Sequence, residues 1–253
     1  MATALITGAS SGLGEEFAWQ LAAAGRDVVL VARSRDRLSE LADMLSGVTG
    51  VKTEVLVADL ATAEGLQAVA DRVADAERPI DLLVNNAGYG LPAGFLVTDV
   101  DQEVAALDVM VKAVLVLSHA AAHAMVARGR GAILNVASVA AWLGNSSYSA
   151  HKSWVTAFTE SIASQLRGTG VSATAVLPGL THTEFHERAR LAEYEDLPEI
   201  AWLDADQVVE SALAAVRRKT VLVTPSVRYA ALTSVVRTLP RSWVRAASRR
   251  RNT

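Results

Sequence analysis

The chain has 253 residues, contains no cysteine and carries a formal net charge of −3. This length suits one α/β domain with a large core and is too short for such a domain plus a separate substrate domain. The missing cysteines exclude disulfides, thiolate catalysis and cysteine-ligated metals, and the negative charge argues against a nucleic-acid-binding protein.

Strand-like and helical stretches alternate along the whole chain. Short apolar runs predict strands at residues 2–7, 27–32, 52–57, 81–84, 132–137, 171–177 and 221–223. This alternation is typical of a parallel sheet with helices on both faces. No repeat or linker divides the sequence, so we expect a single α/β domain, a Rossmann-like doubly wound sheet in three αβα layers. Its ligand should bind beyond the carboxyl ends of the strands.

The first predicted strand leads into a glycine-rich turn, Thr7-Gly8-Ala9-Ser10-Ser11-Gly12-Leu13-Gly14, and then into a helical stretch at residues 15–24. Such a turn points backbone N–H groups and the positive end of a helix at a pyrophosphate, and glycine permits close approach. The glycines are spaced by three residues and then one, unlike the common dinucleotide fingerprint. An ordinary connection between a strand and a helix is the alternative.

An arginine, Arg33, follows the second predicted strand. An acidic residue there would accept a hydrogen bond from the ribose 2′-hydroxyl of NAD, whereas a guanidinium binds the 2′-phosphate of NADP. Ser10 or Ser34 would add a hydroxyl donor. NADP(H) is therefore the predicted cofactor and NAD(H) the alternative, unless Arg33 only begins a solvated, arginine-rich loop.

Polar residues and tight turns follow three later strands: Asn85-Asn86-Ala87-Gly88, Ser138 and Pro178-Gly179. Tyr148 and Lys152 stand one helical turn apart, so their side chains share a helix face. A tyrosine ionises near pH ~10, and acid–base catalysis near neutrality requires a lower pKa. We expect the ammonium of Lys152 to provide that shift.

In this order, the glycine turn, the Asn-Asn-Ala-Gly segment, the Ser-Tyr-Lys trio and the Pro-Gly pair resemble the short-chain dehydrogenase/reductase family, over about residues 2–225. The resemblance implies an oxidoreductase that transfers a hydride between NADP(H) and a carbonyl or alcohol. Tyr148 would be the acid–base, Ser138 would hold the substrate oxygen, and Lys152 would bind the nicotinamide ribose. Their structural alternatives are a strand-end cap for Ser138 and an extended surface side chain for Lys152.

The resemblance also implies a set of cofactor-binding residues. They are Gly8, Ser10, Ser11, Gly12, Leu13, Gly14, Arg33, Asp59, Leu60, Asn85, Ala87, Gly88, Tyr148, Lys152, Pro178, Gly179, Leu180 and Thr183. Backbone groups of Leu180 would bind the nicotinamide carboxamide, and Asp59 would contact adenine. A helix cap is the alternative role for Asp59, and Thr62 would serve equally well.

Aromatic and apolar residues favour a lipophilic substrate. The candidate pocket residues are Tyr89, Leu91, Trp142, Leu143, Phe185, Tyr194 and Trp202. Core packing explains loop aromatics just as simply. We expect residues about 183–203 to form a lid within a catalytic domain spanning residues 1–225. His119 and His123 have no carboxylate between them, so we predict a helix surface there and no metal.

Two features depart from the family pattern. Met110 stands where an asparagine is usual, and this asparagine is thought to hold a water that links the lysine to a proton path. A thioether cannot replace its donors and acceptors. The alternative function is therefore a cofactor-binding sensor or scaffold with little turnover. The ten-residue spacing from Ser138 to Tyr148 is shorter than usual, which should reshape the substrate mouth.

Residues 226–253 form a basic extension with seven arginines and no acidic residue. We expect it to pack on the domain or to trail from it. Its interleaved apolar residues permit an amphipathic helix that touches anionic lipid or another subunit, and a solvated terminal helix is the alternative. Helices near 107–127 and 148–166 should build a homodimer or homotetramer. No leader segment and no apolar run of spanning length is evident, which predicts a cytoplasmic protein.

Overall fold

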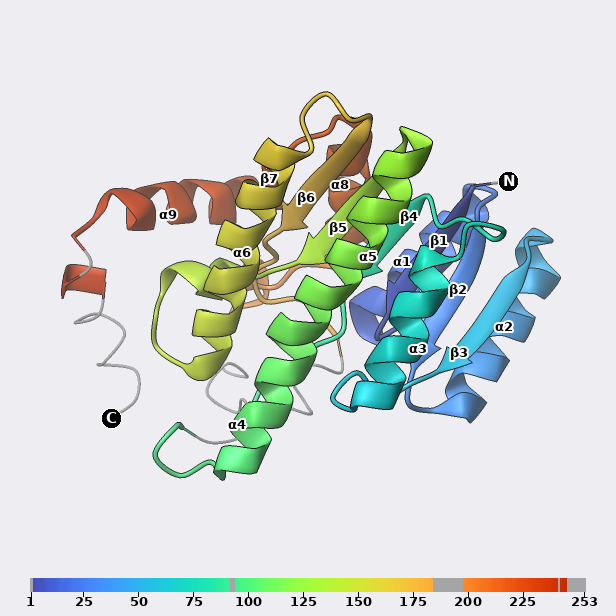
Figure 1. Ribbon diagram of the computed structural model, residues 1–253. Coiled ribbons are helices and arrows are strands. Elements are labelled where there is room, and N and C mark those ends of the chain that lie inside the picture. The colour runs from blue at the N-terminus through green and yellow to red at the C-terminus, as the bar shows by residue number, and fades with distance from the viewer. Residues whose placement is uncertain (1, 92–93, 184–197, 241, 245–253) are drawn as a thin grey trace.

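The computed structural model describes residues 2–91, 94–183, 198–240 and 242–244. Seven parallel strands form one sheet in the order β3-β2-β1-β4-β5-β6-β7 (Figure 1). The strands are β1 (Thr3–Thr7), β2 (Asp27–Ala32), β3 (Thr53–Val57), β4 (Leu82–Asn85), β5 (Gly131–Val136), β6 (Val171–Val176) and β7 (Leu222–Val223). All seven predicted strands are present, each within one residue of its predicted limits. The order of strands reverses between β1 and β4, which is where such sheets bind ligands.

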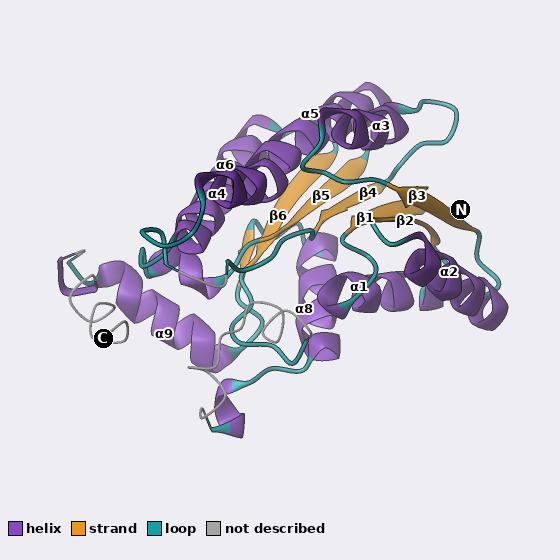
Figure 2. Cartoon of the chain, turned by 90° about the horizontal axis from the view of Figure 1, so that it is seen from below, coloured by secondary structure: helices purple, strands orange, loops and turns teal. Residues whose placement is uncertain are grey.

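Helices cover both faces of the sheet, as predicted (Figure 2). One face carries α1 (Gly12–Ala23), α2 (Arg35–Thr49) and α8 (Ala205–Arg217). The other face carries α3 (Ala63–Ala74), α4 (Val100–Leu107), the π-helical turn η1 (Asp108–Lys112), α5 (Ala113–Arg128) and α6 (Ser147–Gln165). Two 3₁₀ turns, η2 (Val139–Trp142) and η4 (Glu199–Ala201), and the helix α9 (Val227–Thr238) complete the described elements. The fold is a Rossmann-like, three-layer αβα domain.

Alternate residues of each central strand belong to opposite layers. In β1, Ile6 belongs to the same buried cluster as Phe17 of α1, whereas its neighbour Leu5 joins Val69 of α3. Successive side chains of a strand point to opposite faces, and both faces are covered here. This is why the strands read as continuous apolar runs in the sequence.

A chain of buried polar groups crosses the layer between the sheet and the second face. The amide of Asn85 donates to the Ser118 hydroxyl (3.0 Å) and to Oδ1 of Asn135 (2.9 Å). The amide of Asn135 donates in turn to the Thr159 hydroxyl (2.9 Å), which donates to the Val155 carbonyl (2.7 Å). These bonds join β4, β5, α5 and α6 in a fixed register, since an unpaired polar group there would be costly.

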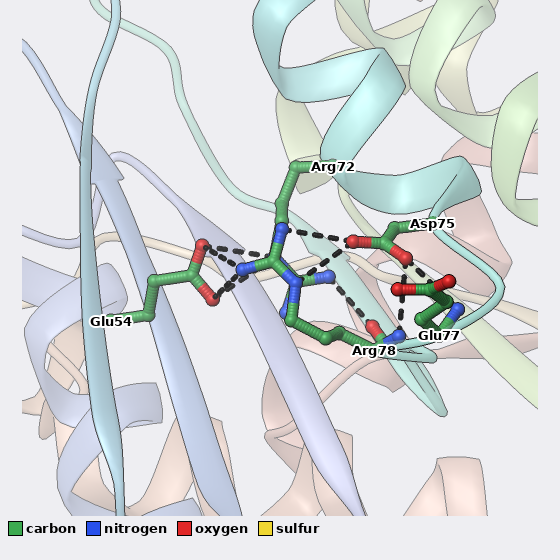
Figure 3. A network of polar contacts seen from close by, with 5 residues as sticks. All are labelled: Glu54, Arg72, Asp75, Glu77 and Arg78. Carbon is green, nitrogen blue, oxygen red and sulfur yellow. Dashed lines mark hydrogen bonds and ion pairs between the residues drawn. The ribbon is translucent and has the colours of Figure 1, made fainter.

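A second polar network ties the edge strand β3 to the end of α3 (Figure 3). The half-buried carboxylate of Glu54 accepts from Nε of Arg72, which is itself buried, at 2.9 and 3.0 Å. Another Arg72 nitrogen donates to the Arg78 carbonyl (2.7 Å), and Arg78 pairs with Asp75. A buried guanidinium needs such partners, and here they anchor the outermost strand.

The continuous helix at Val100–Arg128 is long and apolar enough to span a membrane by length and composition. It is not an uninterrupted apolar run, which is what we expected to be missing, because Lys112, Ser118, His119 and His123 interrupt it. Within its most apolar window 44% is buried, and Leu117, Ala121 and Met125 are part of the core against the sheet. Such a helix is also what a doubly wound core requires. Its outer face exposes Val104, Leu107, Leu115 and Val126, and the predicted subunit contact there stays a prediction.

We predict that Thr159→Val lowers the free energy of unfolding by roughly 1–3 kcal/mol, because the buried Asn135 amide loses its acceptor while the side-chain volume is kept. Urea unfolding would measure this. Thr156→Val is the matched control, since the Thr156 hydroxyl makes the same local bond, to the Lys152 carbonyl (2.8 Å), and no donor to it is found in the described chain. Equal losses in the two variants would contradict the assignment.

Candidate active site

The glycine turn between β1 and α1 depends on its glycines for conformation and for space. Gly8 and Gly12 have φ of +67° and +58°, which residues with a side chain rarely adopt. A Cβ at Gly14 would collide with the Gly8 carbonyl and the Asn86 amide. The turn therefore brings its backbone against the segment that follows β4, and Gly14 serves this packing.

Two polar side chains fasten this junction. The Thr7 hydroxyl accepts from the N–H groups of Asn86 (3.0 Å) and Ala87 (3.1 Å) and donates to the Val84 carbonyl (3.3 Å). The Asn86 amide donates back to the Thr7 carbonyl (2.9 Å) and the Gly8 carbonyl (3.3 Å). The two loops at the point where strand order reverses thus form one unit.

A cavity of about 1720 Å³ opens at the carboxyl ends of the strands. Among the predicted residues it is lined by Gly8, Ser10, Ser11, Gly12, Leu13, Arg33, Asp59, Leu60, Ala87, Gly88, Tyr89, Leu91, Ser138, Trp142, Leu143, Tyr148, Lys152, Pro178, Gly179, Leu180 and Thr183. Segments far apart in sequence therefore meet in one site. Its volume exceeds the roughly 300–1,000 Å³ of common ligand pockets, which leaves room for a dinucleotide and a substrate.

The remaining predicted residues lie elsewhere. Asn85 is buried in the polar chain beneath the site, and Gly14 packs inside the turn. Trp202 does not line the cavity but stacks on His182, with ring centroids 4.9 Å apart. Phe185, Tyr194 and most of the predicted lid (residues 184–197) lie outside the described residues.

One end of the cavity is basic. Arg33 and Ser34 line it together with Arg37, which the sequence reasoning missed. The helix α2 begins at Arg35, so Arg35 and Arg37 belong to a helix and not to the predicted loop, while Arg33 lies exposed just before it. Arg37 lies in the first turn of this helix, and Arg33 and Arg37 both line the same end of the cavity.

Asp59 and Thr62 were both candidates for the N-terminal cap of α3. The Thr62 hydroxyl accepts from the Gly65 N–H (3.1 Å) and caps α3. The Asp59 carboxylate accepts from the Ala61 N–H (2.9 Å), and this residue also lines the cavity. The helix cap is therefore Thr62, and Asp59 shapes the loop at the basic end.

The first turn of α6 is fixed by a reciprocal cap. The Ser146 hydroxyl accepts from the Ser149 N–H (3.2 Å), and the Ser149 hydroxyl accepts from the Ser146 N–H (3.1 Å). This capping box satisfies donors that a helix start leaves unpaired. It sets the rotation of the helix, so that Tyr148 and Lys152 face the cavity from consecutive turns.

Ser138 holds the end of β5 and touches the tyrosine. Its hydroxyl accepts from the Ala140 N–H (3.1 Å), so the strand-end cap that we considered is real. The same hydroxyl lies 3.5 Å from the Pro178 carbonyl and is hydrogen-bonded to Tyr148. Capping and contact with the phenol therefore coexist in one side chain.

Lys152 is only 4% exposed, so the surface alternative for this residue is wrong. Its ammonium donates to the Val136 carbonyl at the end of β5 (2.7 Å) and lies 5.7 Å from the centroid of the Tyr148 ring. Burial lowers the pKa of Lys152 to about 8, because desolvation penalises the charged form.

The pKa of Tyr148 differs from our expectation. Burial raises it to about 12, and the hydrogen bond with Ser138 acts in the opposite direction. We expected the ammonium of Lys152 to lower this pKa, but the lowering comes from Ser138 and is outweighed by desolvation of the phenolate. At neutral pH the phenol is therefore protonated, which is the form needed to give a proton to a substrate oxygen.

Met110 is part of the packed interior beside the site. It is 1% exposed, and it lies in the π-helical turn η1. Its sulfur and the ammonium of Lys152 each lie 3.5 Å from the point that a Cβ of Gly88 would occupy. The thioether thus fills the space next to the lysine where an amide would offer polar atoms.

The segment after β6 has internal partners that we did not foresee. The Leu180 N–H donates to the Tyr229 hydroxyl (3.3 Å), and the Leu180 carbonyl accepts from the Leu203 N–H (2.9 Å). These are the backbone groups assigned to the nicotinamide carboxamide. Tyr229 belongs to α9, which also brings Leu232 and Val236 to the cavity. The sequence signal for these residues was their helical spacing within the basic extension.

No cluster of three or more metal-ligating side chains occurs among the described residues. His119 and His123 lie on the exposed face of α5 with their Nε2 atoms 3.1 Å apart. The predicted helix surface at this pair is confirmed, and it lies apart from the cavity.

Comparison with known proteins places these features in context. A model of the short chain dehydrogenase family matches residues 2–193. Sulfoacetaldehyde reductase 2 of Chromohalobacter salexigens is 38% identical over 72% of this chain and 73% of its own length. The structure of a short-chain dehydrogenase from Sphingobium yanoikuyae in complex with NADPH is 35% identical, with a TM-score of 0.85 and 94% of each chain covered. A bulky-bulky ketone specific alcohol dehydrogenase from Comamonas testosteroni is 30% identical, with a TM-score of 0.81, 94% of this chain and 92% of that chain covered.

The family model spans the glycine turn, the Asn-Asn-Ala-Gly segment and the Ser-Tyr-Lys trio, and the solved structures share the sheet and its helical layers. The chain therefore belongs to the short-chain dehydrogenase/reductase family and is an NAD(P)-dependent oxidoreductase of alcohol or carbonyl substrates.

Proposed function

We propose that this protein is an NADPH-dependent reductase of lipophilic ketones or aldehydes, with Tyr148 as the proton donor. The observation that carries the proposal is the arrangement at the inner end of the cavity. A protonated phenol there is hydrogen-bonded to Ser138 and lies beside the buried ammonium of Lys152. A carbonyl oxygen placed between the two hydroxyls would be held for protonation.

Each side chain has a distinct task in this proposal. Ser138 donates a hydrogen bond to the substrate oxygen and holds it near the phenol. Tyr148 transfers its proton to that oxygen as negative charge develops on it. The cation of Lys152 then stabilises the phenolate, which burial alone disfavours. When bound, NADPH supplies the hydride to the carbonyl carbon.

The residues present fit such a cofactor. The glycine turn borders the cavity at the amino end of α1 through Gly8, Ser10, Ser11, Gly12 and Leu13, where backbone N–H groups would meet a pyrophosphate. The basic end of the cavity, with Arg33 and Arg37, supports NADPH over NADH, because two guanidinium groups would bind the 2′-phosphate. The related Sphingobium yanoikuyae enzyme was solved in complex with NADPH.

The substrate end of the cavity supports a lipophilic carbonyl compound. Trp142 and Leu143 line it from the segment that leads from Ser138 to α6, and Phe95 and Leu96 line it from the loop before α4. Burial of apolar substrate surface against such a lining stabilises the complex. The Comamonas testosteroni relative is named for bulky ketones, which agrees with this chemistry.

A second candidate, a cofactor-binding sensor or scaffold with little turnover, rests on Met110. Its thioether occupies the space beside Lys152 and cannot order a water as an amide would. The Ser138–Tyr148 contact favours the enzyme, since a protein that only binds the cofactor has no need of it.

We expect Tyr148→Phe to fold and to bind NADPH like the wild type, but to lose at least a hundredfold in kcat for ketone reduction, because the ring stays and only the proton donor is removed. Stopped-flow absorbance of NADPH with a bulky aryl ketone would measure the rate, and cofactor fluorescence the binding. Near-normal turnover by Tyr148→Phe would overturn the assigned mechanism.

The cofactor preference should reverse in Arg33→Asp. The variant should bind NADPH more weakly by about 1–3 kcal/mol and gain relative affinity for NADH, because a carboxylate repels the 2′-phosphate and accepts a 2′-hydroxyl. Fluorescence titration with both cofactors would show this. Arg35→Asp is the control, because Arg35 carries the same charge two residues away and does not line the cavity. Equal NADPH and NADH affinities in the wild type would refute the preference.

Met110→Asn separates the two candidate functions. If Met110 limits proton delivery, the variant should turn over ketones several-fold faster with little change in melting temperature. If Met110 is instead well packed in the interior, the buried amide of the variant should lower the free energy of unfolding by roughly 1–3 kcal/mol and bring no gain in rate. Met110→Leu is the control for packing alone, since leucine has similar volume and no polar atoms. A rate increase shared by both variants would show that water binding is not the cause.

A further inference from the structure

The helix α9 lies beyond residues 2–193, the part of the chain that the family model matches. It belongs to the basic extension, yet one of its faces lines the cavity. Tyr229, Leu232, Thr233 and Val236 all border the cavity, and their spacing of three, four and seven residues puts them on one side of the helix. Val235, between two of these residues, does not border it.

Several contacts hold α9 at this position. The ring of Tyr229 packs on Gly179 so closely that a Cβ there would collide with it. The Tyr229 hydroxyl accepts from the Leu180 N–H (3.3 Å) and donates to the Ala201 carbonyl (2.7 Å). Next to it, Arg228 donates to the Ile200 carbonyl (2.6 Å). The amino end of α9 is therefore fastened to the segment that follows β6.

The other end of α9 is fastened to the opposite side of the cavity. The guanidinium of Arg237 lies 4.8 Å from the ring centroid of Trp142, a geometry typical of a cation–π contact. Trp142 ends η2, the turn that begins just after Ser138. The helix thus bridges the turn after β5 and the segment after β6, and its inner face borders the cavity.

We propose that α9 is the outer wall of the substrate site, and that Leu232 and Val236 select ketones with a bulky apolar substituent. The inference rests on the proposed carbonyl reduction and names the residues that choose the substrate. A large apolar group on the carbonyl carbon would bury surface against both side chains, which orients the carbonyl at Tyr148. A small ketone does not reach α9 and gains nothing from it.

The test compares Val236→Trp with Val235→Trp, the same change at adjacent residues on the cavity face and on the outer face. Benzophenone serves as the bulky ketone and acetone as the small one, with NADPH consumption as the readout. Val236→Trp should lower kcat/KM for benzophenone at least tenfold, because the indole fills the space of the substituent, and should leave acetone within about twofold. Val235→Trp should change neither value by more than about twofold.

A second variant tests apolar contact instead of space. Leu232→Asn keeps the number and branching of the side-chain heavy atoms and should lower kcat/KM for benzophenone about five- to tenfold through the loss of apolar contact. Equal effects of the two tryptophan variants, or parallel losses on both ketones, would overturn the role of α9. If the wild type binds NADPH but reduces neither ketone, the proposed function fails. The role of α9 is then tested by the binding of benzophenone, which tryptophan fluorescence monitors. Val236→Trp should raise the Kd of benzophenone about tenfold, and Val235→Trp should leave it unchanged.

Discussion

The buried ammonium of Lys152 is the constraint on which the site depends. It is 4% exposed and donates to the Val136 carbonyl, the last residue of β5. Desolvation lowers its pKa from 10.5 to about 8, which corresponds to roughly 3 kcal/mol of bias against the charged form. This cost comes with the position of the ammonium beside the phenol of Tyr148. Burial of that phenol in turn disfavours its phenolate form. At neutral pH the ammonium is still largely charged and the phenol is protonated, so the cation lies where it would stabilise a phenolate that forms beside it.

The helix that carries both groups is secured along its length. The Ser146–Ser149 capping box fixes its first turn, and the Thr159 hydroxyl ties its middle to Asn135 of β5. Between these points Ser153 donates to the Ala141 carbonyl, which joins α6 to the turn η2. Every bond runs toward β5 or toward the segment after it, so the phenol, the ammonium and Ser138 are held in one rigid unit.

The sequence predicted the parts of this structure that depend on local pattern. Apolar runs predicted all seven strands because both sheet faces are covered. Ser138 was a candidate because it follows a strand, and Tyr148 and Lys152 were candidates because they are one helical turn apart. Burial is not readable from such patterns, and this is why the raised pKa of Tyr148 and the partners of Leu180 were missed. The role of α9 was hidden for the same reason. Exposed apolar residues in an arginine-rich extension look alike whether they face water, lipid or a cavity.

The position of α9 links the two ends of the site. Tyr229 bonds to Leu180, beside the expected nicotinamide position, and Arg237 contacts Trp142, beside the expected substrate. A carboxamide that takes the Leu180 N–H must displace the Tyr229 hydroxyl, which would keep its bond to the Ala201 carbonyl. The exchange replaces one neutral hydrogen bond by another, so it costs little free energy. The contact of Arg237 with Trp142 does not involve Leu180, so it would hold the other end of α9 beside η2 when the Leu180 N–H changes its partner.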